Sequence, residues 1–220
     1  MRGSTVIRIL AASVSVVAWA AIYLCLHGGL GPRINSEPHA SIGRLMAQQA
    51  VAFLKPGGKI TVFARDTSTF KNPATDIQLA SFRKAVGQAH ATIREVRALQ
   101  VDPLRPTEVP SSDFCEVIKN TPKGSVIVSF MGPPVLTPKQ RTRLGEIQPA
   151  IVAFCSGHLP AREGLRLLFE QGLLHAAVVD RLEPESEASQ ARNLDRSGPY
   201  YVAVTTANLA ELVSQKGTRP

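Results

Sequence analysis

Aromatic residues and cysteines are scarce in this 220-residue chain. Phe, Trp and Tyr make up 5% of it, and the three cysteines are Cys25, Cys115 and Cys155. Because no CxxC pair or Cys/His ligand spacing occurs, the sequence predicts neither a disulfide framework nor a metal site. Whether Cys115 and Cys155 pair in an oxidising compartment stays open, since sequence spacing does not fix the distance between their Cα atoms.

Phosphate-binding and metalloprotease motifs are also missing. No GxGxxG follows the first predicted strand, and neither GxxxxGK[ST] nor HExxH occurs anywhere in the chain. A phosphoacceptor receiver domain would need an aspartate at the end of the third strand, where this chain has Met131. We therefore expect no nucleotide and no other cofactor.

The charge is positive but dispersed. Twenty-five Lys and Arg against 17 Asp and Glu give a formal net charge of +8. The basic residues are scattered among acids, whereas nucleic-acid surfaces cluster bases with aromatics, so no nucleic-acid partner is expected. A hydrophobic content of 44% over 220 residues is enough for one sizeable core.

One long uncharged run lies near the N-terminus. Ile9 to Leu26 is just long enough to cross a hydrocarbon core as a helix, and Arg2 and Arg8 precede it. We expect residues 1–8 inside the cell, a single-pass anchor in the inner or plasma membrane over 9–26, a linker over 27–35 and an extracytoplasmic (periplasmic) domain over 36–220. A cleaved signal peptide with a site near Ala18-Trp19-Ala20 is the alternative, and it also places the domain outside the cytoplasm.

Apolar runs of strand length alternate with amphipathic segments through the remaining sequence. This alternation predicts an α/β fold, a doubly wound, mainly parallel, Rossmann-like three-layer sandwich. The predicted strands are Lys59–Arg65, Glu95–Val101, Ser125–Met131, Ala150–Cys155, His175–Val179 and Tyr200–Thr205. The predicted helices are Ser36–Lys55, a helix from Asn72 whose buried stripe runs to Ile93, Ser112–Asn120, Thr137–Ile147, Arg162–Gln171 and Asn208–Ser214, with a long exposed loop over 183–198.

Ligands of such sheets bind beyond the carboxyl ends of the strands. That position nominates eight ligand-binding residues, which are Asp66, Thr67, Ser68, Gly132, Ser156, His158, Asp180 and Arg181. The alternative is structural, because strand ends need turn formers and Asp, Ser, Gly and Pro are such residues. For Gly132 the structural explanation is favoured.

A cysteine stands at one of these strand ends, in Ala153-Phe154-Cys155-Ser156-Gly157-His158. The stretch resembles the nucleophile elbow of the class I glutamine amidotransferase-like family, which implies Cys155 as a nucleophile or redox group, with His158 as a candidate base. Pro160 follows closely, and no acid-plus-histidine pattern identifies the partners. A buried, inert cysteine is the competing interpretation.

A broader resemblance covers residues 59–181. KITVFARDTSTFKNPATDIQLASFRKAV, SVIVSFMGPP and PAIVAFCSG are similar to the strands, loops and helix of one lobe of the type 1 periplasmic binding proteins. Two lobes clasp the ligand in that family, so the resemblance implies that a second copy or a partner supplies the clasp, or that it is absent.

The leading hypothesis is therefore a non-enzymatic, membrane-tethered module that binds a small ligand or a protein partner. A cysteine-dependent hydrolase or redox protein, a structural subunit of a membrane assembly, and a homo-oligomer all stay open.

Overall fold

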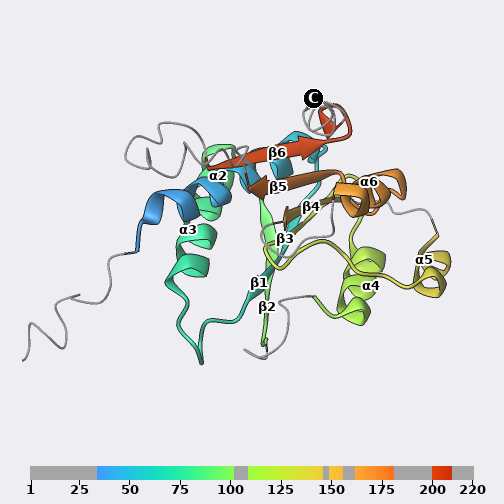
Figure 1. Cartoon of the computed structure of the whole chain (residues 1–220), viewed down its shortest axis with the longest axis horizontal. Helices are drawn as coiled ribbons and strands as arrows, with labels where there is room; N and C mark the ends of the chain where they lie inside the picture. The colour runs from blue at the N-terminus through green and yellow to red at the C-terminus, as the bar shows by residue number, and fades with distance from the viewer. Residues whose placement is uncertain (1–33, 102–108, 146–148, 156–161, 181–199, 210–220) are drawn as a thin grey trace, which may run out of the picture. The chain divides into compact units, whose positions relative to one another are not determined.

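The computed structural model describes residues 34–101, 109–145, 149–155, 162–180 and 200–209 (Figure 1). The chain divides into two units, Met1–Asn35 and Ser36–Pro220, and the fold described below belongs to the second. The predicted anchor over 9–26 and the loop over 183–198 lie outside the described residues. Among the described residues, no helix combines the length and the apolar character that a membrane span requires.

A six-stranded sheet forms the centre of the unit, in the order β2-β1-β3-β4-β5-β6. Strands β2, β1, β3, β4 and β5 are parallel to one another, and β6 pairs antiparallel with β5. In Figure 1 the strands descend from β6 at the top to β2 at the bottom. Their bounds are β1 Ile60–Arg65, β2 Ile93–Leu99, β3 Val126–Ser129, β4 Ala150–Cys155, β5 Ala176–Asp180 and β6 Tyr201–Thr205.

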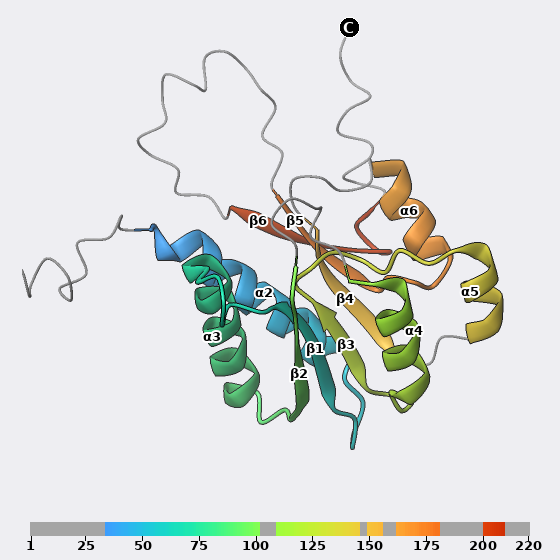
Figure 2. The ribbon, with the colours of Figure 1, turned by 90° about the horizontal axis from the view of Figure 1, so that it is seen from below.

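Helices cover both faces of the sheet, which gives three layers (Figure 2). On one face lie α2 (Ser36–Phe53) and α3 (Pro73–Gln88), and on the other lie α4 (Ser111–Asn120), α5 (Pro138–Leu144) and α6 (Arg162–Glu170). The mainly parallel, doubly wound α/β prediction is thereby confirmed for the described residues.

Alternation along each strand divides the core into two clusters. In β4, Val152 packs on the α2 and α3 side, while Ile151 and Ala153 pack on the α4 and α6 side. Because helices cover both faces of the sheet, the residues that point to either face are apolar, and the strand is a continuous hydrophobic run. This is why the buried strands could be located from sequence to within one or two residues.

The edge strand β2 corrects the sequence prediction at both ends. It begins at Ile93, not Glu95, and ends at Leu99, not Val101. Ile93 therefore belongs to a strand and not to the buried stripe of the preceding helix, and Ala89 is exposed at that helix's C-cap. In the sequence, apolar residues continue at three- and four-residue spacing as far as Ile93, although the helix ends at Gln88.

A Schellman-type C-cap stops α3. The Ala91 N–H donates to the Val86 carbonyl over 3.1 Å, and the His90 N–H donates to the Gly87 carbonyl over 3.0 Å. His90 has a φ of 53°, in the left-handed region where glycine or asparagine is usual. Since histidine occupies that position, the usual sequence signal for the end of the helix is missing.

The start of α4 lies one residue before the predicted Ser112. The helix begins at Ser111, and its N-cap is Pro110, which provides no side-chain hydrogen bond. The Ser112 hydroxyl donates instead to an Asp113 carboxylate oxygen over 3.1 Å. The start of α5 moves by one residue, because Thr137 is its N-cap and forms a capping box with Gln140.

Candidate functional site

The loop after β1 carries three of the nominated residues. An Asp66 carboxylate oxygen accepts the Ser68 N–H over 2.8 Å, and this bond is the main cause that holds the Asp66 pKa below its ordinary value. The Thr67 hydroxyl donates to an Asp76 oxygen in α3 over 2.8 Å. Both side chains therefore fix the loop, as the turn-former interpretation expects, while Ser68 is exposed.

An aromatic side chain that the sequence reasoning passed over follows in the same loop. Phe70 is 60% exposed, although Phe63, Phe82 and Phe114 are fully buried. Asn72 caps α3 directly after it by accepting the Thr75 N–H, which fixes the end of the loop. An aromatic residue within the polar stretch Thr67-Ser68-Thr69-Phe70-Lys71-Asn72 was the signal available in the sequence.

The loop after β3 lies next to the Asp66 loop, because β1 and β3 are neighbours. Its Gly132 has a φ of 92°, and a Cβ added there would meet no atom within 4 Å. The backbone conformation alone explains this glycine, as the sequence analysis favoured. Val135, 57% exposed, adds a second apolar group to this loop.

Asp180 lies farther along the same edge, at the end of β5. It is opposite Tyr201 in β6, and burial, together with the Asp180 charge, raises the Tyr201 pKa. Three strand spacings separate β1 from β5, or about 14 Å. The topology thus brings Asp66, Thr67, Ser68 and Gly132 together and leaves Asp180 apart from them. Ser156, His158 and Arg181 lie outside the described residues.

Cys155 ends β4 inside the core. It is 1% exposed, and burial raises the pKa of its thiol to about 12. The thiolate is the nucleophilic form, and it is nearly absent at neutral pH when the pKa is so high. Cys115 and Cys155 are both free, so they form no disulfide. This geometry favours the interpretation of Cys155 as an inert core residue.

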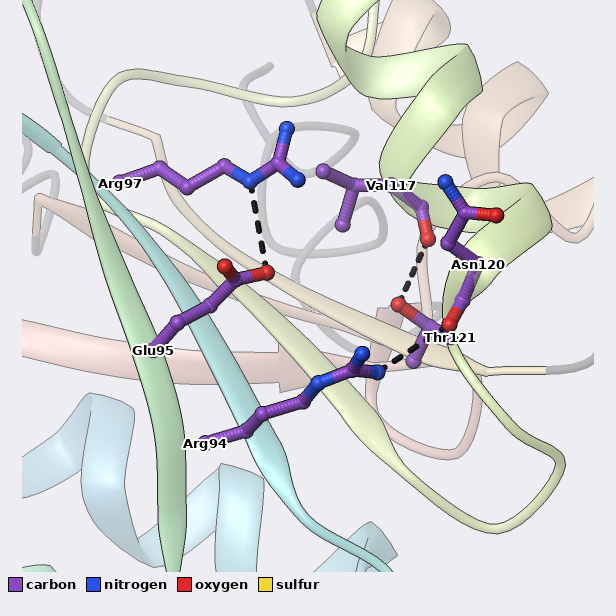
Figure 3. A pocket seen from close by; sticks show the side chains of 6 residues that line it. All are labelled: Arg94, Glu95, Arg97, Val117, Asn120 and Thr121. Carbon is purple, nitrogen blue, oxygen red and sulfur yellow. Dashed lines mark hydrogen bonds and ion pairs between the residues drawn. The ribbon is translucent and has the colours of Figure 1, made fainter.

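A polar pocket of about 260 Å³ lies elsewhere, between the edge strand β2 and the C-terminal end of α4 (Figure 3). Its lining residues are Arg94, Glu95, Arg97, Val117, Asn120 and Thr121. It adjoins the α4 face of the sheet and is separate from the carboxyl-end loops. None of these residues was predicted from the sequence, although three charged residues within Ile93–Leu99 distinguish this strand from the buried ones.

The pocket's charged groups form two separate sets of hydrogen bonds. The Arg94 guanidinium donates to the Asn120 carbonyl over 3.2 Å, and Arg97 donates to a Glu95 oxygen over 3.3 Å. Two further Arg97 nitrogens share one oxygen of Glu116, each at 3.3 Å. The guanidinium groups can bind a small polar ligand or an anion, whereas the Thr121 hydroxyl already donates to the Val117 carbonyl over 2.6 Å.

Comparison with known proteins shows which solved structures share this fold. The sequence matches no protein-family model and no curated protein. Many solved structures match the chain, among them the following three. A periplasmic ribose ABC transporter from Conexibacter woesei DSM 14684 is 13% identical with a TM-score of 0.52, over 80% of this chain and 60% of that one. A periplasmic sugar-binding protein from Pseudomonas fluorescens is 17% identical with a TM-score of 0.51, over 81% and 58%. A structure assigned to the LacI transcriptional regulators, from Bacteroides fragilis, is 14% identical with a TM-score of 0.54, over 80% and 61%.

This chain has the fold of one lobe of a type 1 periplasmic binding protein. The resemblance predicted from the strand and loop sequences is confirmed at the level of fold. The chain spans about three fifths of the length of the structures it matches, and at this identity the likeness establishes the fold and no binding property.

Proposed function

We propose that this protein is a non-enzymatic binding lobe that holds a small polyhydroxylated ligand against the carboxyl edge of its sheet. The observation that carries the proposal is the loop after β1, where an exposed Phe70 follows the polar group Asp66, Thr67 and Ser68. Sugars have apolar ring faces and hydroxyl rims, so an exposed aromatic ring beside hydrogen-bonding groups suits them. The names of the ribose and sugar-binding structures of the same fold support this ligand class.

We also propose that the domain is anchored to a membrane and lies outside the cytoplasm. The uncharged run Ile9–Leu26 with Arg2 and Arg8 before it supports a membrane anchor that places the lobe outside the cytoplasm. Resistance of the full chain to alkaline carbonate extraction from membranes tests the anchor, and complete release by carbonate would contradict it.

One lobe offers one wall of a binding site. In the two-lobed family the second lobe closes over the ligand, so a second copy or a partner would supply that wall here. Without it one side of the ligand stays in water, and fewer of its polar groups are paired by the protein. We therefore expect weak binding by the isolated chain and tighter binding in an assembly.

Calorimetric titration of the purified full chain with ribose, arabinose and fructose tests the ligand class. Phe70→Ala is expected to weaken binding by about three- to tenfold, because the ring supplies one stacking face. Leu167→Ala is the matched control, since Leu167 is 52% exposed but lies on α6, away from the loop. Equal effects of both substitutions, or no heat with any sugar, would count against the proposal.

A further inference from the structure

A register shift between β1 and β2 leaves Arg94 without a paired residue in β1. Ile60 of β1 pairs with Ile93, but the next residue, Thr61, pairs with Glu95, so Arg94 is an extra residue in the strand. Side chains of neighbouring residues normally point to opposite faces of a sheet. The bulge removes that alternation, and Arg94 lines the same pocket as Glu95 and Arg97.

The two guanidinium groups are loosely held. Among the described residues Arg94 forms no ion pair, and its one hydrogen bond is to the neutral carbonyl of Asn120 at 3.2 Å. Each Arg97 contact with Glu95 and Glu116 measures 3.3 Å, whereas strong charge-assisted N–H···O bonds measure about 2.7–2.9 Å. Glu116 is 59% exposed, so water and salt weaken its attraction for Arg97.

The side chains that line the pocket carry two positive charges, on Arg94 and Arg97, and one negative charge, on Glu95. Glu116, which does not line the pocket, approaches Arg97 from α4 and balances the second positive charge while this ion pair is formed. Figure 3 shows both guanidinium groups directed toward the α4 side, where the Thr121 hydroxyl donates to the Val117 carbonyl. Planar guanidinium groups bind tetrahedral oxyanions through paired N–H donors.

We propose that this pocket binds the phosphate group of a small phosphorylated molecule or of a lipid headgroup, bridged between Arg94 and Arg97. The phosphate displaces Glu116 from Arg97 and takes the Arg94 donors that face no carboxylate. The site is separate from the carboxyl-edge loops, so its occupancy does not depend on the proposed sugar site.

Titration of the full chain with inorganic phosphate at constant ionic strength, followed by amide NMR shifts, tests the site. Arg94→Ala and Arg97→Ala are each expected to weaken phosphate binding by about fivefold or more. Arg83→Ala is the matched control, because it removes the same charge from an exposed position on α3. Equal weakening by the Arg83 variant would show a diffuse charge effect and overturn the proposal.

Glu116→Gln distinguishes a phosphate site from a purely structural ion pair. Removing the competing carboxylate is expected to tighten phosphate binding by about twofold or more, and a merely structural role of the ion pair would give no gain. Vesicles containing phosphatidylglycerol, compared with phosphatidylcholine vesicles, distinguish a lipid source. Binding of free phosphate, or of anionic vesicles alone, with loss in both arginine variants supports the site. No binding in either arm contradicts it.

Discussion

His175 lies between α6 and β5 in the chain and is partly buried. Its Nδ1 accepts the Ile151 N–H over 3.2 Å, and its ring meets Phe53 edge-to-face with centroids 5.9 Å apart. Burial lowers its pKa below the ordinary value. The neutral ring therefore joins the amino end of β4 to the C-terminal end of α2.

That burial makes stability depend on pH. The unfolded chain binds a proton at the ordinary histidine pKa of about 6.5 and the folded chain binds it at a lower pH, so the unfolded state holds more protons between the two values. The stability that the neutral His175 contributes is fully present above pH 6.5, and it is lost as the pH falls toward the pKa of His175 in the folded chain. Urea unfolding at pH 7.5 and 5.5 measures this loss, and His175→Gln is expected to reduce it. The same loss in the variant would contradict the assignment.

Single residues at the carboxyl edge show what sequence alone could and could not establish. The apolar run of β1 placed Asp66, Thr67 and Ser68 in the loop after that strand, because buried strands are recognisable as apolar runs, and their ligand-binding role stays a prediction. Whether those side chains face a ligand or form the turn depends on hydrogen bonds such as Thr67 to Asp76, which spacing does not encode. Phe70 was missed because exposure is decided by packing.

At the scale of elements, α2 and α3 pack closely through a glycine. A Cβ added to Gly43 would come within 2.2 Å of the Gln78 carbonyl oxygen and 2.9 Å of the Phe82 nitrogen. Both are backbone atoms, so the two helices would have to move apart. Gly43→Ala is therefore expected to lower the free energy of unfolding by about 2 kcal/mol.

Gly87 on α3 is the matched control for that measurement. A Cβ at Gly87 would meet nothing within 4 Å, so Gly87→Ala is expected to raise the free energy of unfolding by about 0.5 kcal/mol through helix propensity. Urea unfolding of both variants measures the difference. A harmless Gly43→Ala would contradict the close approach of the helices.

Edge elements were predicted less well than central ones for a physical reason. Central strands are buried on both faces, whereas no residue of β2 is fully buried and its charges interrupt the apolar run. The bulge at Arg94 depends on the pairing with β1, and the C-cap of α3 has histidine in place of glycine. Pairing and capping of this kind are tertiary properties, so the Arg94 pocket could not be derived from spacing.

At the scale of the whole molecule, the described unit is one lobe of a fold that elsewhere occurs with a second. The sheet brings the loops after β1 and β3 together at one edge, and the arginine pocket lies apart from them at the α4 side of β2. We propose that the carboxyl edge, and not the arginine pocket, binds the small polyhydroxylated ligand. Because the carboxyl-edge loops and the arginine pocket lie apart, chemical shift changes at the two sites can be told apart.

Amide NMR of the full chain titrated with ribose tests that claim most directly. We expect the shifts to concentrate on residues 66–70 and 130–133, and we expect Phe70→Ala to reduce them while Arg94→Ala leaves them unchanged. Shifts confined to Arg94, Arg97 and the end of α4, or spread evenly over the lobe, would contradict it.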